Sequence, residues 1–233
     1  MTALLASVTH REEALLAARA GVDLIDLKNP GEGALGALGE KEIRQIVETL
    51  PEHCLSATIG DLPLHPRKIA SAVQATGNLG VDYVKIGFFP GGELEPVLEA
   101  LQPLTEHLSL IAVLFADHLI ALPLIGAIAE AGFKGVMLDT ARKNKGSLTR
   151  IRDLAFLRRF VTVAKDHDLL TGLAGSLRQE DIPRLLPLTP DYLGFRGALC
   201  QSGRRTRQLD PQRLAGIRAA IPTPDPVPLT LAN

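Results

Sequence analysis

Two lysines and two aspartates stand at the ends of apolar segments of strand length. Asp26 and Lys28 are two residues apart and so share one face of their segment, while Lys85 and Asp139 occupy corresponding positions in two later segments. An unpaired buried ammonium is costly, so either lysine taken alone is most simply solvent-facing. Their common depth on three strands instead favours a catalytic cluster, with a structural ion-pair cluster as the alternative.

Paired lysines suit carbonyl chemistry. An amine forms a Schiff base with an aldehyde or ketone only when it is deprotonated, and both desolvation and a neighbouring cation lower a lysine pKa towards neutrality. One lysine is then the nucleophile, and the other is a proton shuttle or a cationic neighbour. Asp26 and Asp139 orient the amines and take part in proton transfers, although their charge also raises the lysine pKa values.

These residues require a scaffold that brings several strand ends together. Eight nearly continuous apolar runs, typical of parallel strands buried on both faces, are predicted at residues 3–8, 22–28, 54–60, 81–87, 108–115, 135–140, 169–174 and 192–196. Amphipathic helices are predicted between and after them, at residues 9–20, 40–50, 66–77, 94–101, 119–131, 149–167, 179–186 and 211–220.

Eight evenly spaced strand–helix units in 233 residues predict an α/β fold, a single-domain (β/α)8 TIM barrel. A doubly wound open sheet is the alternative, but it usually has fewer strands. We expect the catalytic barrel domain to span residues 1–220. The proline-rich residues 221–233 lack periodicity and are expected to form a loosely docked tail.

The last two strands end in residues that can bind phosphate. TIM barrels often hold phosphate in the loops after strands seven and eight, where this chain has Gly175-Ser176 and Arg196-Gly197. Glycine lets backbone N–H groups approach an anion, and Ser and Arg side chains add donors. Residues 201–205 add positive charge nearby, with a solvated surface loop as the alternative interpretation.

Several classes of function are disfavoured. The net charge of −1 and the absence of Trp argue against a nucleic-acid partner, and no apolar window reaches the length of a membrane span. Cys54 and Cys200 form no disulfide framework, and the N-terminus lacks a signal peptide pattern, so we expect a cytoplasmic protein. A homo-oligomer is left open by the sequence.

Two further patterns are interpreted as decoys. Residues 31–36 match G-x-G-x-x-G but do not open a clear helix, so we expect a flexible loop over the barrel mouth rather than a dinucleotide site. The six histidines have no metal-ligand spacing, so no metal is expected.

Taken in order, the motifs resemble one family along nearly the whole chain. They are Asp26-Leu27-Lys28, Ile59-Gly60-Asp61, Asp82-Tyr83-Val84-Lys85, Met137-Leu138-Asp139, Leu173-Ala174-Gly175-Ser176 and Arg196-Gly197-Ala198. This set is similar to that of the (5-formylfuran-3-yl)methyl phosphate synthases. The resemblance implies a lyase that joins two molecules of glyceraldehyde 3-phosphate with loss of phosphate and water, in the biosynthesis of a methanofuran-type C1 carrier.

The resemblance also implies roles for single residues. Lys28 matches the Schiff-base lysine and Lys85 the proton acceptor, while Asp26, Asp139 and Lys143 match other charged site positions. Residues 143–146 differ slightly from the family pattern, so Lys145 competes with Lys143 for the last position. No cofactor is implied. The alternatives are a Schiff-base aldolase for another sugar phosphate and a non-catalytic barrel that binds phosphorylated metabolites.

Overall fold

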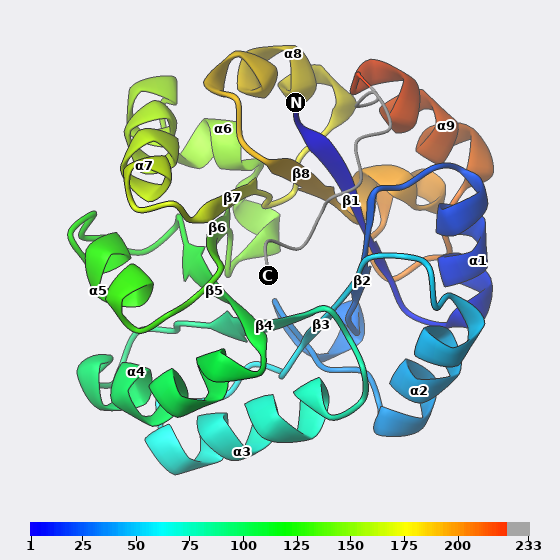
Figure 1. Ribbon diagram of the computed structural model, residues 1–233. Helices are drawn as coiled ribbons and strands as arrows, with labels where there is room; N and C mark the ends of the chain where they lie inside the picture. The colour runs from blue at the N-terminus through cyan, green and yellow to red at the C-terminus, as the bar shows by residue number, and fades with distance from the viewer. Residues whose placement is uncertain (223–233) are drawn as a thin grey trace.

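The protein is a closed barrel of eight parallel strands (Figure 1). The computed structural model describes residues 1–222, so the predicted tail at 221–233 lies outside the described residues except for its first two positions. The strands pair in chain order, and β8 pairs with β1 to close the ring. They are β1 (Ala3–Val8), β2 (Leu24–Leu27), β3 (Leu55–Thr58), β4 (Tyr83–Gly87), β5 (Ser109–Phe115), β6 (Gly135–Asp139), β7 (Leu170–Leu173) and β8 (Tyr192–Phe195). The (β/α)8 prediction is confirmed.

Helices surround the barrel on the outside, as Figure 1 shows. They are α1 (Arg11–Arg19), α2 (Glu40–Thr49), α3 (Pro66–Gly77), α4 (Glu95–Leu101), α5 (Leu124–Glu130), α6 (Leu148–Ile151), α7 (Leu154–Asp166), α8 (Ile182–Leu185) and α9 (Pro211–Ala220). Short 3-10 turns, labelled η, occupy several loops. No helix within residues 1–222 is both long and apolar enough to cross a membrane.

Two of the predicted helices differ from the observed ones. The helix expected at residues 119–131 begins only at Leu124, because Pro123 takes the position that precedes its first turn. The helix expected at residues 149–167 is two helices: Arg152 is extended, and the Asp153 side chain accepts a hydrogen bond from the backbone N–H of Phe156 to start α7. Asp153 was the available signal in the sequence, because aspartate is a preferred residue at the start of a helix.

The strands are buried on both faces by two separate apolar cores. A large core of aliphatic side chains fills the space between the strands and the helices. A smaller one fills the inside of the barrel and includes Leu5, Val113, Met137 and Tyr192. Burial on both faces explains why the strands read as continuous rather than alternating apolar runs.

Polar residues enter the barrel interior at one level. In the strand register, Asp26 of β2 lies opposite Ser7 of β1 and Ser56 of β3. Thr58 of β3 lies opposite Lys85 of β4. Because these positions all point inward, the barrel brings groups from four strands together around its axis.

Three other aspartates lie at the opposite, N-terminal end of the strands. Asp23, Asp82 and Asp191 each precede a strand and accept a backbone N–H from the neighbouring strand at 2.7 Å. Their carboxylates therefore clamp adjacent strands together. This separates them from Asp26 and Asp139, which lie towards the C-terminal ends, where barrel enzymes carry their active sites.

The loop after β2 closes one side of the barrel mouth. Residues 31–36 form a loop, as the sequence predicts, but Ala34 and Leu35 are buried in the inner core rather than exposed. The carboxylate of Asp61 accepts the backbone N–H groups of both residues at 2.7 Å. Leu35 packs over Gly87: a Cβ atom added to Gly87 would lie only 2.8 Å from Cδ1 of Leu35. Because Ala34 and Leu35 fill this side of the barrel mouth with apolar side chains, we call residues 31–36 the plug.

This packing generates a stability prediction. Leu35→Ala should lower the free energy of unfolding by about 2–5 kcal/mol, because it leaves a cavity in the inner core. Leu119→Ala is the matched control, since the Leu119 side chain is 99% exposed. Denaturant unfolding of both variants measures the difference. Equal stability of the two variants would show that the plug does not pack as described.

Candidate active site

Asp26 is the buried centre of the polar cluster. Its Oδ1 atom accepts hydrogen bonds from Lys85 Nζ and Ser56 Oγ, both at 2.8 Å, and its Oδ2 atom accepts one from Ser7 Oγ at 2.9 Å. Burial alone raises the pKa of this carboxyl, but the charges of Lys85 and Lys28 and the hydrogen bonds outweigh it and hold the pKa below its usual value. Asp26 is therefore an anion held between neighbouring strands.

Lys28 follows β2, and its amine lies beside the Asp26 carboxylate. Its Nζ atom lies 3.8 Å from Asp26 Oδ2, and the residue is 7% exposed. Burial lowers the pKa of Lys28 to about 8, although the charges of Asp26 and Asp139 act in the opposite direction. With that pKa about a tenth of the amine is neutral at pH 7, against less than about a thousandth for an ordinary lysine.

Lys85 is placed differently from Lys28. It is 1% exposed, and its ammonium is hydrogen-bonded to Asp26. Lys28 lines the large cavity described below, whereas Lys85 is not among the described residues that line it. The two predicted lysines thus lie in one cluster, with the Asp26 carboxylate as their shared partner and Lys28 as the amine that faces the cavity.

Asp139 and Lys143 form a second ion pair beside Lys28. Asp139 ends β6, and its Oδ1 atom accepts hydrogen bonds from Lys143 Nζ and, at 2.6 Å, from the Thr140 backbone N–H. Burial raises the pKa of Asp139, but the charges of Lys143 and Lys28 outweigh it and lower the pKa overall. The competing residue Lys145 is exposed, so Lys143 is the lysine that reaches the cluster.

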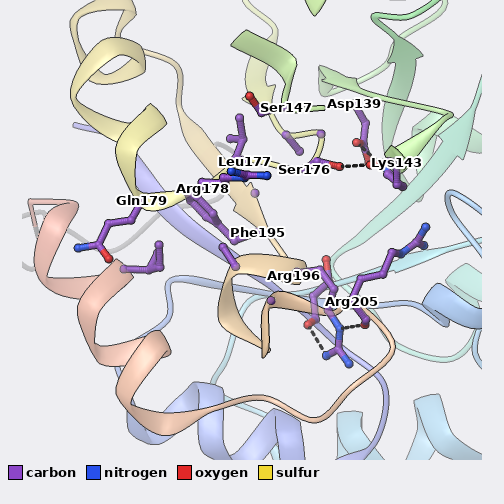
Figure 2. Close-up of a pocket in the computed structure, with 18 of the residues that line it drawn as sticks. Asp139, Lys143, Ser147, Ser176, Leu177, Arg178, Gln179, Phe195, Arg196 and Arg205 are labelled. Atoms are coloured by element: carbon purple, nitrogen blue, oxygen red, sulfur yellow. Dashed lines mark hydrogen bonds and ion pairs between the residues drawn. The ribbon is translucent and has the colours of Figure 1, made fainter. Parts of the chain in front are cut away.

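A cavity of about 780 Å³ opens above these groups. It is lined from β1, β2 and β6 by Ser7, Lys28, Met137, Asp139 and Lys143, and from the β7 and β8 loops by Gly175, Ser176, Arg178, Arg196, Gly197 and Arg205. Figure 2 shows the Asp139–Lys143 pair on one wall and Arg196 and Arg205 on another. Its volume falls in the range of ordinary small-molecule sites.

The β7 and β8 loops offer backbone donors to this cavity. Gly175 has φ 106° and Ser176 φ 49°, so the β7 loop turns through the left-handed region. Within residues 1–222, the backbone N–H groups of Gly175, Ser176, Gly197 and Ala198 donate to no protein acceptor. The Ser176 hydroxyl donates instead to the Lys143 carbonyl at 3.1 Å (Figure 2). Such amides are suited to a phosphate group.

Arg196 is held by the protein rather than directed at the cavity. Its Nη1 and Nη2 atoms lie 2.5 and 3.2 Å from the two carboxylate oxygens of Glu13, in the first turn of α1. The remaining N–H groups donate to the carbonyls of Ser7, Arg205 and Arg207. All five N–H groups of the guanidinium thus have protein acceptors, and none remains for a ligand.

Comparison with known proteins identifies the family. Residues 4–218 match the model of the 4-HFC-P synthase family. A (5-formylfuran-3-yl)methyl phosphate synthase from Methanopyrus kandleri is 37% identical over 88% of this chain and 92% of its own. The chain belongs to this family. A protein from Methylorubrum extorquens that carries the same name provisionally is 42% identical, over 91% of this chain and 88% of its own.

The solved structures support the fold alone. The phosphoribosyl anthranilate isomerase from Thermus thermophilus superposes with a TM-score of 0.66 at 18% identity, over 94% of this chain and 98% of its own. A 3-hexulose-6-phosphate synthase gives a TM-score of 0.62, also at 18% identity, over 95% and 100%. At 18% sequence identity, the likeness to these two enzymes establishes the barrel fold but says nothing about the activity of this chain.

Most of the predicted site residues meet in one place. Asp26, Lys28, Lys85, Asp139 and Lys143 form one charged cluster. The cavity beside it is lined by Gly175, Ser176, Arg196 and Gly197. The exception is the role proposed for the Arg196 side chain, because its N–H groups are already bonded to protein. Within residues 1–222 no group of three or more His, Cys, Asp or Glu side chains is placed to hold a metal ion.

Three residues of the site were missed from the sequence. Ser7 and Ser56 orient Asp26, and Glu13 holds Arg196. Ser7 is the one polar residue of β1, and Ser56 and Thr58 are the polar residues of β3, which was the available signal. Glu13 gave none, because an acidic residue in the first turn of a helix is adequately explained by the helix dipole.

The neighbours of Lys28 predict its response to mutation. Lys143→Met removes a cation that lowers the Lys28 pKa and also leaves Asp139 without its partner, so both changes raise that pKa. Labelling of Lys28 by formaldehyde and cyanoborohydride, followed by peptide mass mapping, should shift to higher pH. Lys145→Met is the control and should leave the profile in place. A shift to lower pH in Lys143→Met would contradict these electrostatics.

The Glu13–Arg196 pair predicts a stability effect rather than a binding effect. Arg196→Ala leaves a buried carboxylate unpaired, so the free energy of unfolding should fall by about 3–5 kcal/mol. Glu13→Ala should cost a similar amount, and the double variant less than the sum. Arg204→Ala, in the same loop but exposed, is the control. If Arg196→Ala kept full stability and only raised KM, the side chain would belong to the ligand site after all.

Proposed function

We propose that the protein condenses two molecules of glyceraldehyde 3-phosphate to (5-formylfuran-3-yl)methyl phosphate through a Schiff base on Lys28. One observation carries the proposal: the Lys28 amine, whose pKa burial lowers to about 8, lines a cavity that is also lined by unbonded backbone amides of the β7 and β8 loops. The amine suits an aldehyde, and the amides suit a phosphate. The membership of the synthase family supports this choice of substrate and product.

The first step forms the covalent bond to the protein. Neutral Lys28 attacks carbon 1 of one triose phosphate, and water leaves to give an iminium. The amides of Gly175, Ser176, Gly197 and Ala198, which line the same cavity, hold the phosphate of this molecule. The carboxylate of Asp139 lies beside the bound aldehyde and balances the charge of the iminium.

The iminium makes the hydrogen on carbon 2 acidic. We assign its removal to the Asp26–Lys85 pair, whose carboxylate lies 3.8 Å from Lys28 Nζ and 2.8 Å from Lys85 Nζ. The electrons released can expel phosphate from carbon 3, which leaves that carbon electrophilic. Carbon 2 of the second triose phosphate, after loss of its own proton, then forms a bond to this carbon.

The later steps close the ring and balance the atoms. The oxygen on carbon 2 of the first triose attacks the aldehyde carbon of the second, dehydration gives the furan, and water releases the formyl group from Lys28. The net change is one phosphate and two waters lost from two trioses, without oxidation or reduction. The reaction needs no redox cofactor, and the aromatic ring drives it forward.

This product fits an early step of a methanofuran-type C1 carrier, whose furan ring would come from such a phosphate. We place the reaction in the cytoplasm, where free thiols such as Cys54 and Cys200 stay reduced. A Schiff-base aldolase for another sugar phosphate would use the same lysine but would form no furan. A non-catalytic binding barrel would have no use for an amine of lowered pKa inside its cavity.

The direct test combines product analysis with trapping. Incubation with glyceraldehyde 3-phosphate should yield a furan ultraviolet band and a product of the expected mass, and borohydride should leave an adduct on the Lys28 peptide. Lys28→Arg should abolish turnover, because the guanidinium stays protonated. Lys85→Arg should be very slow yet still trapped at Lys28.

Lys145→Arg is the control for both variants and should retain full activity, because Lys145 is exposed outside the cluster. An adduct on Lys85, or full activity in Lys28→Arg, would overturn the assignment of roles. A folded wild-type protein that forms no furan from glyceraldehyde 3-phosphate would overturn the substrate itself.

A further inference from the structure

Two arginines of the β8 loop contribute to the cavity in different ways. Arg196 has every N–H bonded to protein, whereas Arg205 donates a single hydrogen bond, from Nη2 to the Gly33 carbonyl at 2.5 Å. In Figure 2 the two side chains extend away from each other. Arg205 therefore reaches from the β8 loop across the mouth to the plug after β2, and its other N–H groups have no acceptor within residues 1–222.

The charge of Arg205 is also unpaired in the described part of the chain. The two carboxylates whose charge acts on Arg205, Asp139 and Asp61, are engaged elsewhere: Asp139 pairs with Lys143, and Asp61 accepts the backbone N–H groups of Ala34 and Leu35. The side chain is half-buried and lines the cavity. A partly desolvated guanidinium with free donors is a strong site for a planar or tetrahedral oxyanion.

The proposed reaction requires such a second anion site. One triose loses its phosphate while bound to Lys28, and the other keeps its phosphate in the product. The unbonded amides of Gly175, Ser176, Gly197 and Ala198 line the cavity on the β7 and β8 loops. The guanidinium of Arg205 lies at the Gly33 end of the mouth, on the β2 side of the barrel. The Arg205 backbone lies beside Gly197, but its guanidinium reaches the Gly33 carbonyl, so the two phosphates have two different sets of donors available.

We infer that Arg205 binds the phosphate of the second triose, the one retained in the product, and so selects a phosphorylated acceptor. This assignment rests on the proposed condensation. The bond to Gly33 positions the free guanidinium edge, and the apolar plug beneath it keeps that part of the mouth closed. Arg205 is a substrate-binding residue here and moves no proton.

The share of product that carries a phosphate measures whether Arg205 selects a phosphorylated second triose. A mixture of glyceraldehyde 3-phosphate and excess glyceraldehyde offers acceptors with and without phosphate, and mass spectrometry separates the phosphorylated furan aldehyde from the unphosphorylated one. Wild-type protein should form the phosphorylated product almost alone. Arg205→Gln should lower the ratio of the two by about tenfold or more, because a charge-assisted bond to phosphate is lost.

Matched variants separate recognition from structure. Arg205→Lys keeps the charge and should give an intermediate ratio, while exposed Arg204→Ala should match wild type. Borohydride trapping at Lys28 should remain normal in Arg205→Gln, because the first triose does not contact Arg205. A merely structural link to Gly33 would slow both products equally and leave the ratio unchanged.

Two results would overturn the inference. One is an unchanged product ratio in Arg205→Gln and Arg205→Lys while both still form furan. The other is loss of trapping at Lys28 in these folded variants, which would place Arg205 on the first triose. Failure of wild-type protein to form any furan would instead refute the proposed condensation.

Discussion

The shared carboxylate of Asp26 is the interaction on which the site depends. A charge with no exposed surface is tolerated because four strands supply its partners: Ser7, Ser56, Lys85 and, at longer range, Lys28. An unpaired ion at this depth would cost several kcal/mol. Asp26 thereby keeps two amines close together in an apolar barrel while leaving one of them facing the cavity.

The barrel mouth has an apolar side, which is packed, and an open side, which forms the cavity. On the β4–β5 side the plug residue Leu35 packs with Phe89 and Phe115, whose ring centroids lie 4.3 Å apart. On the β6–β8 side small residues and free amides leave an open, polar cavity. The apolar half removes water from the lysine cluster, which lowers the Lys28 pKa, and the polar half receives the anionic ends of a ligand.

Much of this could be predicted from the sequence because the signals were local. Continuous apolar runs predicted the eight strands, and the two-residue spacing of Asp26 and Lys28 predicted that they share one face. The direction of Arg196 could not be predicted, since its acceptors come from Glu13, 183 positions away in the chain, and from carbonyls that carry no sequence signal. The burial of Leu35 could not be predicted for a similar reason. Its glycine-rich neighbours indicate a mobile loop, and the carboxylate that holds this loop belongs to Asp61, in another part of the chain.

The central claim is that the folded barrel holds a lysine amine ready to react near neutral pH. The most direct measurement is an NMR titration of the lysine side chains, with the Lys28 signal assigned by its loss in Lys28→Arg. We expect the Lys28 amine to titrate with a midpoint of about 8. A midpoint at the ordinary lysine value of 10.5 would contradict the account.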